Sequence, residues 1–452
     1  MSVAQAVLRR IGRIKGPGLV ASLARSAGSA FAIQAAGQAL VFVSQLILAR
    51  VMGRAEFGIF TWISSWVLTL GVLVALGLPP ASMRFLPEYT AKEDWAHLRG
   101  VASRSQALVW IAGVSLAVIG ACVLLLVRPP HYTMYFVPGL IGLCIVPLTG
   151  QSLLLTQMCR ALRRVALAYA PSRILQPLLV LGVAFAFVHH RKVATGVHML
   201  IAMAAAVAVA WFLQRLLFQR DLNNEAPAVA PAYDIKAWMA VAMPLLLVSV
   251  CQMTISQVDV LTVGAVLGPR DVAVYGMVNR FVGVIGFAMI ATNAALGPEI
   301  ATFHVKGDRA SLQLAVSATV KMTSLCAAGM AIVLLCVAKP VLSLVGHGYA
   351  AGYAALCLLT LGALVNSSAG PVGLILNMTG HQKATLAVFS VGAVLDIALN
   401  YVLVHKYGYI GAAFASMTTM ILWNVWLCAL VKKYLQVDTF IGALLFKKPQ
   451  RV

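Results

Sequence analysis

Charged residues are scarce in this sequence, since Asp, Glu, Lys and Arg make up only 10% of its 452 residues. Hydrophobic residues make up 61%, and the mean hydropathy is +0.91. A water-soluble protein needs a polar surface that this composition does not supply. Apolar runs of about twenty residues recur along nearly the whole chain, and each is long enough to cross a bilayer as a helix. The alternating pattern of a membrane β-barrel is absent. The composition predicts an all-α integral membrane protein.

The sequence also lacks the motifs of metal, nucleotide and nucleophilic chemistry. Its eight cysteines show no CxxC spacing, its nine histidines form no HExxH motif, and no Walker, nucleophile-elbow or Gly-rich phosphate motif occurs. Glu88, Glu93 and Asp94 fall in a charged segment and are expected to be solvated. We therefore predict no metal, no cofactor, no ATP hydrolysis and no enzymatic activity.

A net charge of +21 is compatible with nucleic-acid binding in a soluble fold. Here, however, the basic residues separate apolar runs and do not build one continuous surface. The charge therefore indicates membrane topology and not a nucleic-acid partner.

Gly, Pro and charged residues divide the apolar runs into about twelve crossings in two sets of six. The first set is expected near residues 28–49, 57–78, 105–127, 134–157, 165–188 and 195–218. The second set is expected near residues 238–267, 271–297, 313–338, 350–376, 384–405 and 408–431. We divide the chain into a basic N-terminal segment (1–27), a first six-helix half (28–218), a proline-bearing linker (219–236), a second half (237–431) and a basic tail (432–452).

The basic residues are distributed unevenly between the two sides of this predicted bundle. With the N-terminus inside, the inward segments carry about two thirds of the 34 lysines and arginines. The positive-inside rule then places both termini and the linker in the cytoplasm of a multi-pass protein. The segment from Pro79 to Arg104 is predicted to be an amphipathic connector on the cytoplasmic side. The tail from Tyr434 to Phe446 is too short to span and is expected to form an interfacial amphipathic helix.

The two halves repeat each other. The run from Leu48 to Gly53 leads to Phe57-Gly58, and the run from Val263 to Gly268 leads to Ala273-Val274-Tyr275 at an offset of 215 residues. Because each half has an even number of crossings, both enter the membrane from the same side. The expected architecture is two parallel six-helix halves around a central cavity.

Together with these repeats, several further motifs resemble the polysaccharide-transporter family of flippases. They are Ala49-Arg50 with Gly53 and Phe57-Gly58, Gly77-Leu78 with Arg84, Asp259, Leu267-Gly268 with Tyr275, Pro298, Lys306-Gly307-Asp308, Gly346 with Tyr349, Leu376 to Gly380 with Lys383, and Gly408 to Ala413. The superfamily of that family also holds multidrug and toxin exporters and lipid II flippases. Ala273 stands where such proteins often have Gly, and the chain lacks the extra helix pair that some relatives use for the lipid tail.

The resemblance implies that the chain flips a polyprenyl-diphosphate-linked glycan across the bacterial inner membrane for O-antigen or exopolysaccharide biosynthesis. It also implies alternating access of the two halves, contact with membrane lipid, and a glycan polymerase and chain-length machinery as partners.

Such a substrate needs cations for its phosphates and polar groups for its hydroxyls. The candidate intramembrane cations are Arg173, Arg280 and Lys321, with interhelical pairing or snorkelling to the headgroups as the structural alternative. Polar stripes support a hydrated cleft, with interhelical hydrogen bonding as the alternative. The candidate lining residues are Gln34, Gln38 and Gln45 in one stripe and Gln252 and Ser256 in the equivalent one.

The intramembrane anions Asp259 and Asp396 are candidates for gating or ion coupling. Asp259 lies ten residues before Pro269, and Arg280 lies ten residues after Arg270, so both are expected about 15 Å from the same boundary. This equal depth suggests that Asp259 pairs with Arg280 in one conformational state, either as a gate or as a permanent bridge.

Two other functions compete with the flippase. A cation-coupled drug exporter of the same superfamily should carry more acidic than basic residues in its cavity, whereas this chain has three candidate cations and two carboxylates. A membrane-embedded glycan polymerase or ligase needs catalytic residues in a sizeable outward loop, and the outward loops predicted here are short.

The predicted topology can be tested by labelling single cysteines in a cysteine-free background. Cysteines placed near Arg128, Lys192 and Lys406 should react with an impermeant thiol reagent in intact spheroplasts, because they lie in outward loops. Cysteines near Arg163, Lys383 and Lys447 should not react. The reverse pattern would invert the orientation.

Overall fold

The computed structural model describes residues 17–127, 132–190, 193–286, 289, 296, 300, 303 and 308–440. Almost all of these residues are in helices. The first half contains α2 (Pro17–Met52), α3 (Arg54–Val74), α4 (Leu78–Lys92), α5 (Trp95–Val127), α6 (Tyr132–Ala161), α7 (Val165–Ala170), η1 (Pro171–Leu175), α8 (Gln176–His189) and α9 (Gly196–Glu225). The second half contains α10 (Ile235–Val266), α11 (Pro269–Gly283), α13 (Arg309–Val345), η2 (Tyr349–Gly352), α14 (Tyr353–Ala369), α15 (Val372–Met378) and α16 (Gln382–Leu435).

The predicted all-α membrane fold is confirmed. Ten described segments are long and apolar enough to cross a bilayer. Two of them combine shorter elements, α7, η1 and α8 in one case and η2, α14 and α15 in the other. The 54-residue α16 supplies two crossings because the chain reverses at Gly408, and α11 begins a further one, so 12 crossings in all are accounted for in the described ranges.

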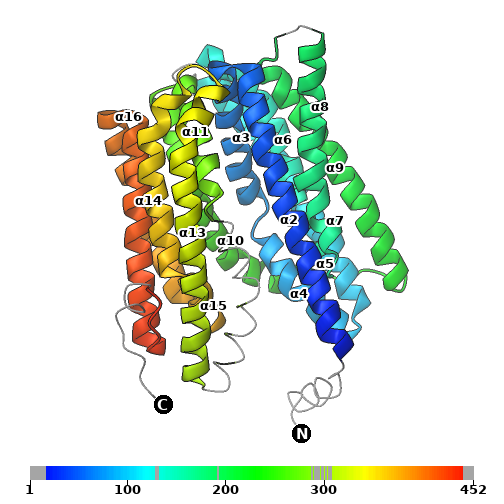
Figure 1. Cartoon of the computed structure of the whole chain (residues 1–452). Helices are drawn as coiled ribbons and strands as arrows, with labels where there is room; N and C mark the ends of the chain where they lie inside the picture. The colour runs from blue at the N-terminus through cyan, green and yellow to red at the C-terminus, as the bar shows by residue number, and fades with distance from the viewer. Residues whose placement is uncertain are drawn as a thin grey trace.

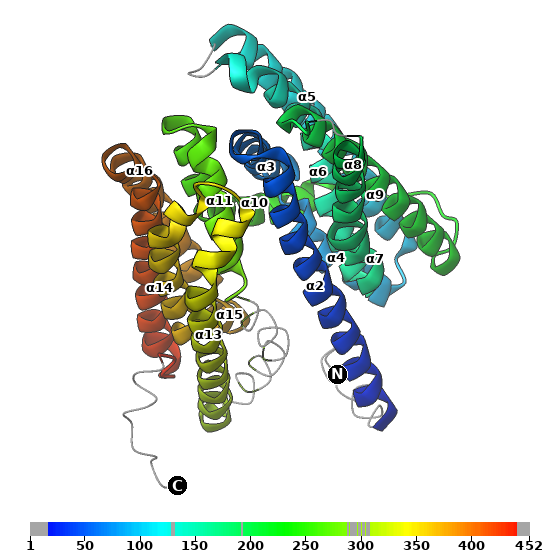
Figure 2. The ribbon, with the colours of Figure 1, turned by 45° about the horizontal axis from the view of Figure 1, so that its top comes forward.

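The helices form two groups on either side of α2 and α3 (Figures 1 and 2). Helices α4 to α9 make one group and α11 to α16 the other. We call the end at which α2 begins and α16 finishes the terminal end (Figure 1). The opposite end carries the α2–α3 and α10–α11 turns, and we call it the turn end.

The two turns at this end have the same geometry, which supports the predicted duplication. Gly53 precedes α3 with φ 77° and ψ 168°, and Gly268 precedes α11 with φ 99° and ψ −177°. Side-chain-bearing residues rarely adopt a backbone with φ in this range. The repeated glycine therefore sets the same sharp entry into the second helix of each half.

The boundary of the third crossing was predicted wrongly. It was expected to begin near residue 105, but α5 begins at Trp95. Asp94 caps this helix, since its carboxylate accepts a 3.1 Å hydrogen bond from the His97 amide. That hydrogen bond also lowers the pKa of the Asp94 carboxyl. The predicted connector is therefore helix α4 followed by the first turns of α5, and α4 buries Phe85 and Leu86.

The tail also differs from its prediction in the part that the structure describes. An interfacial helix was expected from Tyr434, but α16 ends at Leu435 and residues 437–440 are not helical. Gln436 adopts a left-handed conformation, and the Asp438 backbone exchanges hydrogen bonds of 2.8 and 2.9 Å with the Gln313 side chain. These bonds hold the start of the tail on α13. Residues 441–452 and 1–16 lie outside the described residues.

The linker between the halves is fixed to the first half by Arg99. The Arg99 guanidinium donates to the carbonyl oxygens of Pro227 and Ala226 at 2.9 and 3.0 Å and to the Asn223 side chain at 3.1 Å. The Ala232 amide donates to the Ala96 carbonyl at 2.9 Å. Beyond the linker, the Trp238 indole donates to the Tyr89 hydroxyl at 3.0 Å. The first turns of α10 are therefore held against α4 and α5.

Replacing Arg99 with Ala should release this linker. The variant loses three hydrogen bonds from a cation, which together stabilise the docked linker by about 2 kcal/mol. Limited chymotrypsin digestion should then cleave faster at Tyr233. Arg104→Ala, an exposed position on the same helix, is the control and should digest like the unmodified protein. Equal digestion of both variants would show that Arg99 does not hold the linker.

Candidate functional site

A cavity of about 300 Å³ lies where α3 of the first half meets α10, α11, α14 and α16 of the second. We call it the acidic cavity because two carboxylates line it, Asp259 from α10 and Asp396 from α16. Its other polar lining residues are Thr61, Ser65, Ser256, Gln257, Asn279, Arg280 and Ser416. The site is therefore built from both halves.

Asp259 is held by hydrogen bonds from α11. Its carboxylate accepts from the Tyr275 hydroxyl at 2.8 Å and from the Asn279 amide at 3.2 Å. The other oxygen faces the Val260 amide at 2.7 Å. Asp259 is only 5% exposed, and a buried carboxylate needs such donors because it has lost its hydration. Asp259 thus joins α10 to α11 through neutral donors.

Asp396 lines the acidic cavity from α16. It is 1% exposed and accepts a 3.1 Å hydrogen bond from Asn400, one turn later on α16. Across the cavity on α3, the Thr61 hydroxyl is buried and has no hydrogen-bond partner among the described residues. Two carboxylates and a free hydroxyl therefore face one enclosed space, an arrangement that can hold a proton or a small cation.

Arg280 differs from these residues because its side chain is exposed although it comes from a helix whose preceding residues 272–278 are buried. It lines the acidic cavity and also a second cavity of about 300 Å³ between α2 and α11. The other lining residues of this second space, which we call the α2 cavity, are Ala35, Gln38, Ala39, Val41, Phe42 and Val284. Arg280 is therefore a cation shared by two adjoining cavities.

Arg173 reaches the α2 cavity through Gln38. Its guanidinium donates to the Gln38 side-chain oxygen at 2.9 Å. Arg173 lies in η1, a π-helical segment, and such segments occur frequently at functional sites. Its Cβ lies so close to Gly37 that a side chain there would collide with it. The close approach of η1 to α2 thus places a cation of the first half beside the cavity lined by Arg280.

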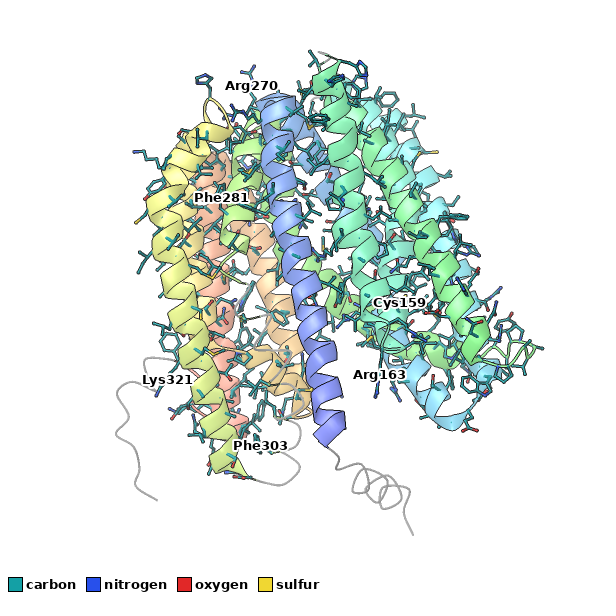
Figure 3. The ribbon with its side chains drawn as sticks, turned by 45° about the vertical axis from the view of Figure 1, so that its right-hand side comes forward. Cys159, Arg163, Arg270, Phe281, Phe303 and Lys321 are labelled. Atoms are coloured by element: carbon teal, nitrogen blue, oxygen red, sulfur yellow. The ribbon has the colours of Figure 1, made fainter. Side chains whose placement is uncertain are left out.

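The structure brings together some of the residues predicted from the sequence and separates others. Ser256, Asp259, Asp396 and Arg280 line the acidic cavity, and Gln38 with Arg173 joins them through the α2 cavity. The predicted residues that line neither cavity are Gln34, Gln45, Gln252, Lys321 and Arg173, of which Arg173 bonds the lining residue Gln38. Lys321 is exposed on α13 toward the terminal end (Figure 3).

The predicted pair between Asp259 and Arg280 is not formed in this conformation. Among the described residues no ion pair joins them, although both line the acidic cavity. The Asp259 carboxylate accepts hydrogen bonds from Tyr275 and Asn279 instead. Figure 3 shows Arg270 at the turn end and Phe281, the neighbour of Arg280, farther into the bundle.

Sequence reasoning missed most of the neutral polar residues of the site. Asn279 and Tyr275 are four residues apart on α11, and Asn400 follows Asp396 by four on α16, so helical spacing from known charges could have found them. Thr61 and Ser65 share the same spacing on α3, but no charge predicted to lie inside the membrane is close to them in the sequence.

Two family models match the chain. The model described as polysaccharide biosynthesis protein matches residues 23–304, and the model described as MatE matches residues 244–402. No curated protein matches the chain.

Solved transporters share the fold at low sequence identity. An inward-facing multidrug resistance MATE family transporter of the MOP superfamily superposes with a TM-score of 0.77 at 13% identity, covering 88% of this chain and 94% of the other. The lipid II flippase MurJ in an inward closed conformation gives 0.71 at 14% identity, with 89% and 87% covered. An outward-facing MATE family transporter gives 0.63 at 14% identity, with 90% and 96% covered.

The hydrogen bond between Tyr275 and Asp259 should contribute measurably to stability. Tyr275→Phe removes a buried donor and leaves the carboxylate underbonded, which should cost about 1–3 kcal/mol and lower the melting temperature of the purified protein. Tyr349→Phe is the matched control, because the buried Tyr349 hydroxyl has no hydrogen-bond partner within the described part of the chain, so its removal should be neutral or stabilising. Equal melting temperatures for the two variants would contradict this reading.

Proposed function

The chain belongs to the polysaccharide biosynthesis protein family, and from this premise we propose that it translocates a lipid-diphosphate-linked oligosaccharide or polysaccharide precursor across the bacterial inner membrane. The membrane transporter fold is shared with MATE transporters and a lipid II flippase. The glycan formed from this precursor would serve O-antigen or exopolysaccharide biosynthesis, with a polymerase and chain-length machinery as downstream partners.

The observation that carries the proposal is the exposed Arg280 at the junction of the two cavities. A cation inside a membrane protein is costly unless it faces water, a partner or a ligand. Arg280 has no anionic partner among the described residues, and Arg173 adds a second cation through Gln38. A diphosphate carries the complementary charge, and guanidinium groups bind phosphate with directed hydrogen bonds.

The α2 cavity also suits the lipid part of such a substrate. Besides Gln38 and Arg280, its lining is apolar and includes Phe42 and Val284. A molecule with a charged diphosphate and an adjoining hydrocarbon chain can place both parts there at once. The hydroxyls and amides of the acidic cavity, such as Ser256 and Gln257, are available to sugar hydroxyls.

Transport would proceed by alternating access, in which the halves rock around this site. α2 begins and α16 finishes at the terminal end (Figure 1), and the excess of Lys and Arg in the segments predicted to face inward would assign that end to the cytoplasm. The substrate would then enter from the cytoplasm and leave at the turn end. The higher TM-score to an inward-facing than to an outward-facing transporter supports an inward-facing state.

Asp259 and Asp396 would couple this movement to an ion gradient. Both are nearly inaccessible and line the same acidic cavity, so binding of a proton or small cation would relieve their mutual repulsion. Protonation of Asp259 would remove its negative charge, which would favour substrate phosphate over Asp259 as the partner of Arg280.

A cation-coupled drug exporter is the second candidate, favoured by this carboxylate pair. The matched MatE region contains both Asp259 and Asp396. An exporter would use the carboxylates for its cationic substrates and would have no need for an exposed Arg280. The two functions therefore make opposite demands on that arginine.

Arg280→Ala should abolish flipping of a fluorescent polyprenyl-diphosphate oligosaccharide in proteoliposomes, because the site loses its directed phosphate donor. Arg280→Lys should retain partial activity, since it keeps the charge and loses the planar fork. Lys321→Ala, outside both cavities, is the control and should flip at the unmodified rate. All variants should insert at equal abundance.

The same preparations separate the two candidate functions. Efflux of an organic cation that survives Arg280→Ala and is lost in Asp259→Asn would establish the exporter. Unimpaired flipping by Arg280→Ala would reject the cationic site.

A further inference from the structure

Arg54 connects the two halves at the turn end. It is the first residue of α3, and its Nε donates to the Arg270 carbonyl oxygen of the second half at 2.9 Å. Its Nη2 lies 3.5 Å from the Asp271 carboxylate, and both side chains are about 30% exposed. Arg54 of the first half thus binds the first turn of α11 through one backbone acceptor, the Arg270 carbonyl oxygen, and one side-chain acceptor, the Asp271 carboxylate.

Both ends of this contact are anchored in their own half. Two residues after Arg54, the Glu56 carboxylate accepts a 2.6 Å hydrogen bond from the Gly196 amide, which ties the start of α3 to the start of α9. On the other side, α11 packs against η2, where Gly352 lies against Val274 and Val278. A force on the Arg54 contact therefore acts between two packed groups of helices and not between two loose turns.

The surrounding backbone is shaped around the contact. Gly58 lies so close to the Pro269 carbonyl that any side chain there would overlap it. Gly348, in a left-handed conformation with φ 89°, lies against the Arg54 guanidinium, and a Cβ there would also collide. These glycines allow α3, α11 and η2 to approach closely enough to close the turn end.

The contact is not reproduced by the duplication. At the offset of 215 residues, Glu56 corresponds to Asp271, so each half carries a carboxylate in the first turn of this helix. Asp271 receives the cation of the other half, whereas Glu56 binds the Gly196 amide of its own half. Of these two corresponding carboxylates, only Asp271 crosses between the halves.

We infer that Arg54 with Asp271 and the Arg270 carbonyl forms a latch that holds the turn end closed and must open once in each transport cycle. This role rests on the proposed alternating access, since the halves cannot part at the turn end while Arg54 bridges them. Arg54 is a positioning residue, because it lines neither cavity and acts by setting the balance between the closed and open turn end.

Hydrogen–deuterium exchange of the full-length protein in nanodiscs, without substrate, tests the latch. Arg54→Ala should raise the exchange rate of residues 46–62 and 263–281 roughly two- to five-fold, the factor expected from losing a partly exposed ion pair. Asp271→Asn, nearly identical in shape, should give a smaller rise in the same segments because the bond to the Arg270 carbonyl remains.

Glu56→Gln is the matched control. It alters a carboxylate in the same turn whose contact stays within the first half, so exchange at residues 263–281 should stay unchanged. Unchanged exchange in Arg54→Ala would overturn the latch. A rise of the same size at residues 92–106, near the terminal end, would also overturn it by showing general loosening of the fold.

This readout is independent of the cargo. If the unmodified protein fails to flip the glycan lipid while the Arg54 variants change exchange as expected, the proposed substrate is rejected and the latch stands. If flipping is confirmed and exchange does not respond, the latch is rejected and the proposed function stands.

Discussion

The hydrocarbon core of a bilayer offers no hydrogen bonds, and this constraint governs the molecule. Every backbone polar group at that depth must be satisfied within the protein, which restricts the described crossings to helices. The two acidic side chains of the candidate site obey the same rule. Asp259 is satisfied by Tyr275 and Asn279, and Asp396 by Asn400, so the acidic groups are held by short, directed bonds. Arg280 instead opens into two cavities. The site can be recognised because it combines bonded carboxylates with a cation that faces cavities.

The same constraint explains why most of the fold could be predicted from the sequence. Runs of apolar residues must be long enough to span, and glycines such as Gly53, Gly268 and Gly408 mark the places where the chain turns. The errors occurred where water is available. Asp94 could start α5 well before the apolar run, and Gln313 could bind the Asp438 backbone and divert the tail. Local hydrogen bonding decides such positions, and hydropathy does not register it.

The candidate site was harder to predict than the fold. The depth of a residue in the membrane follows from counting residues along its helix, but the direction in which its side chain points within the bundle does not. Counting placed Asp259 and Arg280 at similar depths, and the structure puts both on one cavity. It could not show that Tyr275 and Asn279 would take the Asp259 carboxylate, or that Lys321 would lie outside the cavities. Arg173 lies in η1, a π-helical segment packed beside Gly37, and counting residues along a regular α-helix does not predict that approach.

Helix α10 is attached to both halves. The boundary between the two predicted repeats therefore does not coincide with a boundary between parts that could move as rigid bodies. The duplication predicted from the sequence divides the chain before α10, yet the Trp238 indole near the start of that helix donates to Tyr89, and the Leu261 carbonyl near its end accepts from Trp62, both in the first half. Asp259 meanwhile ties the same helix to α11. If the halves rotate as bodies, α10 cannot follow both and must itself flex. Pro244 lies between the two attachments and lacks the amide that would stiffen the helix there. The bending of each transport cycle would then be concentrated in the turn of α10 around Pro244. That turn would act as an elastic connection between the two repeats.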